Sequence, residues 1–324
     1  MLRKFFIPFL FCIVFLFVGC ASLRGRVLSA EEEALLYPVE SYVPEEFNWQ
    51  EIRIGGGAGA GADMRVVPGV WRFDFKSRDP SFPLIYHAVK IELSASGSTG
   101  ADDGQGSRSE ADAGERGVAG AARFTLESSL WERTADFAAR EECLVAMNAT
   151  PFDKTRLAGI CKVDGKKLSQ PVARYAALGL RCAAGGQVLE GRIYESQTDV
   201  ALADCEAAFG GFFLVLEDGQ VCTDFVRRHT SRSGAGLSAD GKTLYLLVVE
   251  GERPRQSMGL SYPQCGEIFR AMGCSHALEF DGGGSSELCI NGHSVISYRV
   301  GRVQGTSFGF SLMSSSDLSQ GAVK

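Results

Sequence analysis

The chain has 324 residues and a formal net charge of -6, with 45% hydrophobic and 22% charged residues. Without its apolar N-terminal segment it keeps roughly 300 residues, enough for one large or two small domains. The mild acidity argues against a nucleic-acid partner, because such partners are generally bound by a basic stripe. It does not argue against a phosphate ligand, since a phosphate group needs only local positive charge.

The N-terminus has the features of an export signal. Arg3 and Lys4 form a basic start, and residues 5–18 are apolar apart from Pro8. That run is short for a membrane span and fits the core of a signal peptide. Cys20 follows a glycine at its end, which resembles a bacterial lipoprotein processing site. We therefore predict a lipoprotein signal peptide at residues 1–19 and a lipid on Cys20 that anchors the exported protein in the bacterial cell envelope. An uncleaved membrane anchor is the alternative.

Residues 20–64 are predicted to form a tether and lead-in to one domain at residues 65–324. The glycine-rich stretch 55–61 invites a dinucleotide-binding interpretation, but that fingerprint needs a helix directly afterwards. Residues 66–73 are instead strand-like and interrupted by Pro and Gly, so a linker or loop is favoured. Within the domain, residues 94–120 have no aromatic residue and are rich in Gly, Ser, Ala, Asp and Glu. This composition predicts a disordered insertion.

The rest of the chain combines short apolar strands with a few helical patterns. We predict strands at residues 84–93, 123–126, 143–147, 175–182, 188–194 and 244–249, a hairpin turn at 164–166, and helices at 134–142, 196–208 and 261–273. The last helix is the clearest, because Ser261 can cap it and Gly273 can end it. The strand–helix–strand order around it suggests a crossover between parallel neighbours. The predicted fold class is α+β, with a mixed β-sheet core and a few packed helices.

The ten cysteines include Cys12 in the signal and Cys20 at the lipid site. The others form no Cys-x-x-Cys pair, so a zinc ribbon or a redox motif is unsupported. An exported chain permits disulfides. Several of these cysteines nevertheless lie in apolar or helical patterns, where a free thiol packs as a small hydrophobic group. We therefore predict mostly free, buried thiols.

The most informative stretch is the loop Asp281-Gly282-Gly283-Gly284-Ser285-Ser286, which lies between two short apolar runs. Three successive glycines allow positive φ angles and close approach of a ligand to the backbone. Successive N–H groups can then form an anion-binding nest, and two hydroxyls follow directly. A glycine-rich hairpin turn with a solvated aspartate is the alternative interpretation.

Three further pieces precede this loop: Ser231-Arg232-Ser233-Gly234-Ala235-Gly236, Glu250-Gly251, and Met258-Gly259-Leu260-Ser261. Together with the loop they resemble the phosphodiester glycosidase family, over roughly residues 83–313. The sequence from Asn148 to Phe152 stands where the family usually has Asn-Gly-Gly-Phe-Phe, but Ala and Thr replace its glycines. The loss of these glycines is the main departure from the family pattern.

The resemblance and the chemistry of the side chains assign candidate roles. Asp281 is the favoured catalytic carboxylate or sugar-hydroxyl acceptor. Glu279 stands two residues earlier, so in a strand it would share a face with Asp281, with the Cα atoms about 6.5 to 7 Å apart. Relatives more often have Asn there, and they usually have Asp where this chain has Glu250, which could orient the loop or act as acid or base.

The phosphate would be held by positive and N–H groups. Arg232 offers a planar fork of donors that matches phosphate oxygens. Arg302 matches a second family arginine, although a surface ion pair is an equal alternative. The loop residues Gly282, Gly283, Gly284, Ser285 and Ser286 would complete the phosphate or substrate site. Asn148 could bind sugar hydroxyls or hold a neighbouring loop.

The resemblance implies a hydrolase that cleaves the glycosidic bond of a sugar-1-phosphodiester with an N-acetylhexosamine-like sugar, and the N-terminal signal predicts that it is anchored in the envelope. A non-catalytic lipoprotein that binds phosphoglycans is the alternative, motivated by the missing glycines after Asn148. A phosphodiesterase that breaks the P–O bond is disfavoured, because no metal motif is present. The expected partners are a sugar-phosphodiester or phosphoglycan substrate and the membrane through the lipid. We predict no cofactor, no metal site and no nucleic-acid partner.

Overall fold

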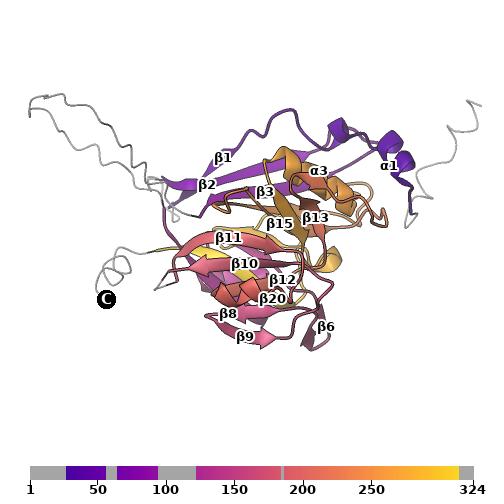
Figure 1. The fold of residues 1–324 in the computed structure, drawn as a ribbon. Helices are drawn as coiled ribbons and strands as arrows, with labels where there is room; N and C mark the ends of the chain where they lie inside the picture. Colours follow the sequence, from indigo (N-terminus) through magenta and orange to yellow (C-terminus); the bar gives the residue numbers. More distant parts are fainter. Residues whose placement is uncertain (1–26, 56–63, 94–121, 184–185, 314–324) are drawn as a thin grey trace, which may run out of the picture.

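The computed structural model describes residues 27–55, 64–93, 122–183 and 186–313 (Figure 1). The predicted signal peptide, Cys20 and the predicted insertion at 94–120 lie outside the described residues, as does most of the glycine-rich stretch. Within the described parts no helix is long and apolar enough to cross a membrane.

The largest element is an eight-stranded sheet, seen in the upper part of Figure 1. Its strand order is β1 (Gln50–Ile54), β2 (Arg65–Lys76), β3 (Ile85–Glu92), β16 (Thr243–Val249), β15 (Arg232–Leu237), β17 (His276–Glu279), β13 (Leu214–Glu217) and β14 (Gln220–Val221). Neighbours in this sheet pair antiparallel throughout.

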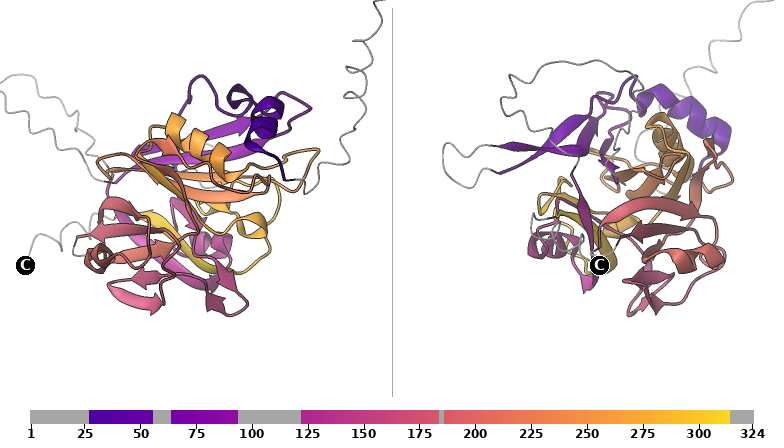
Figure 2. Two further views of the ribbon diagram at one scale, coloured as in Figure 1. Left: turned by 45° about the vertical axis from the view of Figure 1, so that its right-hand side comes forward. Right: turned by 60° about the vertical axis from the view of Figure 1, so that its left-hand side comes forward.

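Two five-stranded sheets form the other half of the molecule, and Figure 2 shows them from two further sides. One has the order β11 (Val188–Tyr194), β10 (Ala177–Cys182), β12 (Ala207–Gly210), β8 (Cys161–Val163) and β9 (Lys166–Ser169). The other has the order β19 (His293–Ser294), β18 (Leu288–Ile290), β5 (Val145–Asn148), β20 (Gln304–Leu312) and β4 (Phe124–Glu132). A small hairpin joins β6 (Phe152–Asp153) to β7 (Arg156–Leu157).

The large sheet is buried on both faces, because successive side chains of a strand point to opposite sides. Ala235, Leu246 and Leu278 belong to the core that it shares with the two smaller sheets. Tyr245 and Ala277 belong to a second core on its other face, under α3 (Tyr262–Ala271) and the N-terminal segment. The α+β fold class predicted from the sequence is confirmed.

Helix α3 begins and ends as the sequence predicts. Ser261 and Gln264 form a capping box at its start, and Gly273 has a φ of 95° just beyond its end. The expectation of parallel neighbouring strands is wrong, however. The strands that α3 connects, β16 and β17, are separated by β15, which pairs antiparallel with both of them. They therefore run in the same direction without touching, and both end at the same sheet edge.

Other helix predictions need correction. Residues 196–208 form only a 3-10 turn at Val200–Asp204, which the Asp199 side chain caps, and strand β12 follows at once. All four residues of β12 are buried, because β12 is a central strand between β10 and β8. Helix α2 (Thr134–Arg140) starts one residue after Arg133, so Thr134 is its first residue and not its cap.

The segment before residue 65 is more closely joined to the domain than a tether would be. It contains α1 (Ala30–Leu36), a 3-10 turn (Val39–Ser41) and β1, the edge strand of the large sheet. In α1 the buried Glu33 accepts a hydrogen bond from Arg227 at 2.8 Å and lies 3.1 Å from His229. Two hairpin residues, Asp164 and Gly165, have φ angles of 49° and 73°, which confirms the predicted turn. The remaining eight cysteines are all free, and six of them are buried, as predicted.

Candidate functional site

The glycine loop lies at the sheet edge where β16 and β17 end and β15 begins. Residues Gly283–Ser285 form a 3-10 turn, and Gly283 has a φ of 58°, a left-handed conformation that favours glycine. Four loop N–H groups are bonded to the protein: those of Asp281, Gly283, Ser285 and Ser286. Two of the six loop N–H groups, those of Gly282 and Gly284, have no such bond within the described chain. The predicted anion-binding nest would therefore consist of these two groups. Open space surrounds the Gly284 Cα, since a methyl group added there would meet no atom within 4 Å.

Asn148 ties the loop to two other segments. Its amide nitrogen donates to the Asp281 carbonyl at 2.7 Å. Its amide oxygen accepts from the Ser233 hydroxyl at 2.8 Å and from the Glu287 N–H at 2.9 Å. The side chain is fully buried. Of the two roles considered for Asn148, these contacts favour holding the loop over binding sugar hydroxyls.

Asp281 is half-buried at the mouth of the loop. Burial raises the pKa of its carboxyl, while the Ser285 hydroxyl and the positive charge of Arg302 act in the opposite direction. Arg302 is exposed, and its guanidinium lies over the Phe152 ring at 4.7 Å. The positive charge of Arg302 thus acts on a carboxyl group of the glycine loop. The Ser286 hydroxyl is buried there and has no hydrogen-bond partner among the described residues.

The sequence predicted that the Arg232 guanidinium binds the phosphate, but in the structure this group is already bonded to the protein. Its Nε donates to the Leu260 carbonyl at 2.9 Å, and one terminal nitrogen donates to the Arg228 carbonyl at 2.7 Å. The guanidinium is stacked 3.9 Å from the centre of the Tyr262 ring. The side chain is only 7% exposed. These contacts favour a structural role for Arg232 under α3.

Glu279 is also separated from Asp281. Strand β17 ends at Glu279, and the two carboxyl groups have different neighbours: Arg232 and Cys265 for Glu279, and Ser285 and Arg302 for Asp281. Burial raises the pKa of Glu279 to about 7, while the charge of Arg232 and a contact with Cys265 lower it. Both carboxylate oxygens are buried and have no hydrogen-bond partner in the described chain. The predicted pair of carboxylates on one strand face is therefore not formed.

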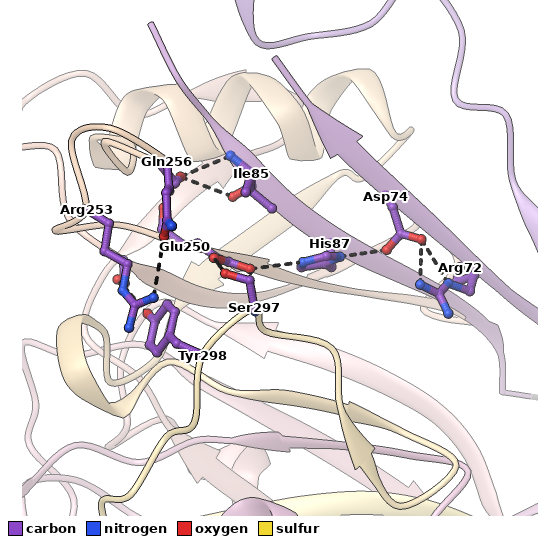
Figure 3. A network of polar contacts seen from close by, with 11 residues as sticks. Arg72, Asp74, Ile85, His87, Glu250, Arg253, Gln256, Ser297 and Tyr298 are labelled. Carbon is purple, nitrogen blue, oxygen red and sulfur yellow. Dashed lines mark hydrogen bonds and ion pairs between the residues drawn. The ribbon is translucent and has the colours of Figure 1, made fainter. Parts of the chain in front are cut away.

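Glu250 is fully buried at the end of β16 and belongs to a network shown in Figure 3. The Ser297 N–H donates to its carboxylate at 2.8 Å, and the Ser297 hydroxyl donates to it as well. His87 Nε2 lies 3.4 Å away on the other side, and His87 Nδ1 lies 2.6 Å from Asp74. Burial alone raises the pKa of Glu250, but the bonds from His87 and Ser297 outweigh it, so the pKa is lowered. Of its two candidate roles, this geometry favours orienting the segment around Ser297.

One acidic residue of this edge was not found from the sequence. Glu252 is exposed and accepts a hydrogen bond from the Ser231 hydroxyl at 2.6 Å. Its Oε1 lies 3.9 Å from the point where a Cβ on Gly283 would stand. Its φ of 55° is uncommon for a glutamate and marks local backbone strain. The signal available in the sequence was its place two residues after Glu250, directly beyond a strand end.

The described residues contain no group of three or more His, Cys, Asp or Glu side chains that could hold a metal ion. The site therefore consists of a half-buried carboxylate, an exposed arginine, glycine N–H groups and hydroxyls. Such groups can hold an anion and stabilise positive charge that develops next to it.

Comparison with known proteins agrees with this description. A family model described as phosphodiester glycosidase matches residues 141–309, just over half of the chain. The chain therefore belongs to the phosphodiester glycosidase family, which confirms the sequence resemblance. The match spans Asn148, the β15 strand and the glycine loop. No curated protein matches the chain.

Two solved structures are similar in fold. The catalytic domain of zebrafish N-acetylglucosamine-1-phosphodiester alpha-N-acetylglucosaminidase, auto-inhibited by its pro-peptide, has a TM-score of 0.52 at 17% identity, over 80% of this chain and 87% of that chain. A hypothetical protein from Synechocystis has a TM-score of 0.53 at 12% identity, over 82% and 68% of the two chains. At these identities the likeness establishes the fold.

Proposed function

We propose that the protein hydrolyses the bond between C1 of a sugar and a phosphodiester oxygen. The observation that carries the proposal is Asp281, a half-buried carboxylate on the glycine loop whose pKa burial raises and the positive charge of Arg302 lowers, within the segment that matches the family. The choice of an N-acetylhexosamine-like sugar follows the zebrafish enzyme, whose name specifies that substrate.

The reaction would proceed as a hydrolysis with a phosphate leaving group. The C1–O bond breaks, and its electron pair stays on the phosphate oxygen, so that the diester leaves as a phosphomonoester. Water supplies the hydroxyl that bonds to C1, and Asp281 accepts its proton. Arg302 and the N–H groups of Gly282 and Gly284 stabilise the departing anion.

A phosphate leaving group explains why one accessible carboxylate can suffice. Glycosidases that release an alcohol need a second carboxyl group to protonate it. Phosphate departs as a stabilised anion without that proton. This is consistent with the buried positions of Glu250 and Glu279, which are 0% and 1% exposed.

The decisive experiment identifies the products from a defined N-acetylglucosamine-1-phosphodiester. Free sugar and a phosphomonoester are expected. Release of sugar phosphate would instead indicate cleavage of the P–O bond by a phosphodiesterase. Binding of phosphoglycan without release of either product would indicate the non-catalytic lipoprotein.

We also propose that the protein is exported and anchored in the cell envelope by a lipid on Cys20. The support is the basic start at Arg3 and Lys4, the apolar run that follows, and the glycine before Cys20. A labelled fatty acid should be incorporated into the wild type and lost in Cys20→Ala. A mature wild-type protein that carries no lipid, or that retains residues 1–19, would contradict this proposal.

A further inference from the structure

An open cleft of about 1600 Å³ lies beside the glycine loop. Its walls come from the β2–β3 connection at residues 76–83, from residues 227–230 and from residues 252–258. None of the residues assigned to the reaction above lines it. Among its lining residues, six are Lys or Arg and two are Asp or Glu. A cleft this basic is unexpected in a chain whose formal net charge is -6.

The two acidic residues of the cleft are already engaged by the protein. Asp79 accepts hydrogen bonds from the Ser81 N–H at 2.8 Å and the Ser81 hydroxyl at 2.7 Å, which close a local turn. Glu252 accepts from Ser231. Neither carboxylate forms an ion pair with a cleft cation within the described chain. Neither carboxylate of the cleft therefore neutralises one of its cations.

Only one of the six basic residues, Arg227, has an acidic partner within the described chain. Arg227 is paired with Glu33 at 2.8 Å, and Arg253 lies 3.7 Å from the centre of the Tyr298 ring. The other four form no ion pair with any residue that the structure describes: Lys76, Arg78, Arg228 and Arg255. These four cations come from three separate segments of the wall. Their field favours a ligand that carries negative charge at more than one point.

The cleft adjoins the glycine loop at Glu252, and no residue of the loop lines it. Glu252 lines the cleft and stands next to Gly283, and Ser297 lines it while it donates to Glu250. A ligand whose scissile phosphate lies at Gly282 and Gly284 can therefore extend into the cleft. The cleft volume exceeds the roughly 300 to 1,000 Å³ that a small-molecule site usually has. It is large enough for a second unit of a chain-like substrate.

We propose that this cleft binds a further phosphate group of the substrate, so that the natural substrate is a polyanionic glycan with repeated phosphodiester links. The proposal rests on the proposed function for the position of the scissile bond. Phosphate oxygens match the guanidinium forks of Arg78, Arg228 and Arg255. The side of the phosphodiester opposite the released sugar would occupy the cleft.

A nucleic acid is the other polyanion that a basic cleft can bind. Sites for single strands combine positive charge with aromatic side chains on which the bases stack. Tyr37 is the one Phe, Tyr or Trp residue among the described residues that line the cleft. A phosphoglycan, which has no bases to stack, therefore fits these walls better.

The test compares the double variant Arg78→Ala/Arg255→Ala with a matched control, Lys166→Ala/Lys167→Ala. The control removes two exposed cations from β9, in a different sheet. The substrates are N-acetylglucosamine-1-phosphodiesters with one or two phosphodiester links. In the cleft variant, KM for the longer substrate should rise by up to about 25-fold more than KM for the shorter one, because each of the two lost cations weakens binding by up to about fivefold. An equal rise for both substrates, or the same selective rise in the control, would overturn the proposal.

A binding measurement separates this proposal from the proposed function. Short-chain inorganic polyphosphate is titrated into the wild type and both variants at low and high salt. Tighter binding to the wild type and the control than to the cleft variant, lost at high salt, is expected even if no substrate is hydrolysed. Equal binding by all three proteins would refute the cleft as a polyanion site. Tighter binding of a single-stranded oligonucleotide than of polyphosphate would refute the choice of a phosphoglycan.

Discussion

Near the end of the large sheet where β15 begins and β17 ends, two pairs of charged residues differ in their exposure to solvent. In the glycine loop, Asp281 is half-buried, and the positive charge of the exposed Arg302 acts on its carboxyl. On the face of the sheet that α3 covers, Glu279 and Arg232 are enclosed, at 1% and 7% exposure. Each of the two places holds a carboxylate and an arginine. Only the first pair includes an exposed charged residue.

Alternation of side chains along β15 places Arg232 on the face of the sheet that α3 covers. Ser233 and Arg232 are neighbours in β15, yet Ser233 bonds Asn148 while Arg232 stacks on Tyr262 of α3. Gly234 and Gly236 let the ring of Phe269 approach β15, because a Cβ at either position would lie within about 3 Å of it. The helix thereby covers Arg232 and Glu279. A charged residue in a family-like motif can thus serve the fold rather than the reaction.

The largest expected effect is the loss of turnover when Asp281 is replaced. Asp281→Asn keeps the shape of the side chain but removes the charge and the basicity of the carboxylate. We expect kcat to fall by about two to three decades, the equivalent of roughly 3 to 4 kcal/mol of transition-state stabilisation. Turnover of the N-acetylglucosamine-1-phosphodiester measures this effect.

Thermal unfolding of the same variant is the control. Asn148 bonds the Asp281 carbonyl and not its carboxylate, so the loop should keep its anchor. A melting temperature close to that of the wild type is therefore expected. A variant that is folded and turns over normally would show that the catalytic carboxylate lies elsewhere, with Glu252 as the next candidate.

The burial of Glu279 under α3 should make the free energy of unfolding depend on pH. Glu279 has a pKa raised from 4.5 to about 7 by burial, so the native state favours its protonated form. Its contribution to stability is present below pH 4.5 and is lost as the pH rises to about 7. Glu279→Gln removes this loss. The variant should match the wild type near pH 4 and exceed it at pH 8, by up to about 3 kcal/mol at 1.36 kcal/mol per pKa unit.

Denaturant unfolding of both proteins at several pH values checks this result. The difference between them isolates Glu279 from other groups with shifted pKa values, such as Glu287, raised to about 7, and Asp74, which is lowered. The groups that face Glu279 are Arg232 and Cys265. If the difference between variant and wild type does not change with pH, Glu279 does not titrate in this range. If Glu279→Gln is folded but has no turnover, Glu279 takes part in the reaction.

Local patterns predicted the parts of the fold that depend on near neighbours. The α3 boundaries, the hairpin at Asp164 and most strands follow from capping, turn residues and alternation. The 3-10 turn at Val200–Asp204 was missed because its apolar residues also fit a helix, and only pairing of β12 with β10 and β8 decides between them. The order of strands in the large sheet brings Asp74, His87 and Glu250 into one network, and no local pattern contains that information.

The site divides in the same way. The motif located the glycine loop and Asp281, because the glycines, hydroxyls and carboxylate of one short segment can be recognised together. It could not tell which face Arg232 and Glu279 occupy, since that depends on where β17 ends and on what covers the sheet. The exposed Glu252 was missed because its role comes from contacts with Ser231 and Gly283, both distant in sequence.

The smallest effect is expected from Arg232→Lys. The matched variant for comparison is Arg302→Lys, at the arginine whose charge acts on the glycine loop. A lysine at 232 keeps the charge but cannot donate to both the Leu260 and Arg228 carbonyls, and it loses the planar stack on Tyr262. We expect a loss of about 1 to 2 kcal/mol in the free energy of unfolding, in line with one or two hydrogen bonds. Arg302→Lys should do the reverse, because its exposed guanidinium lies over Phe152 and supports no buried carbonyl. Its KM for the sugar phosphodiester should rise while the unfolding free energy stays within about 0.5 kcal/mol of the wild type. If instead Arg232→Lys raises KM for the phosphodiester and leaves stability unchanged, Arg232 does contact the phosphate, and α3 must move away from the sheet edge when substrate binds.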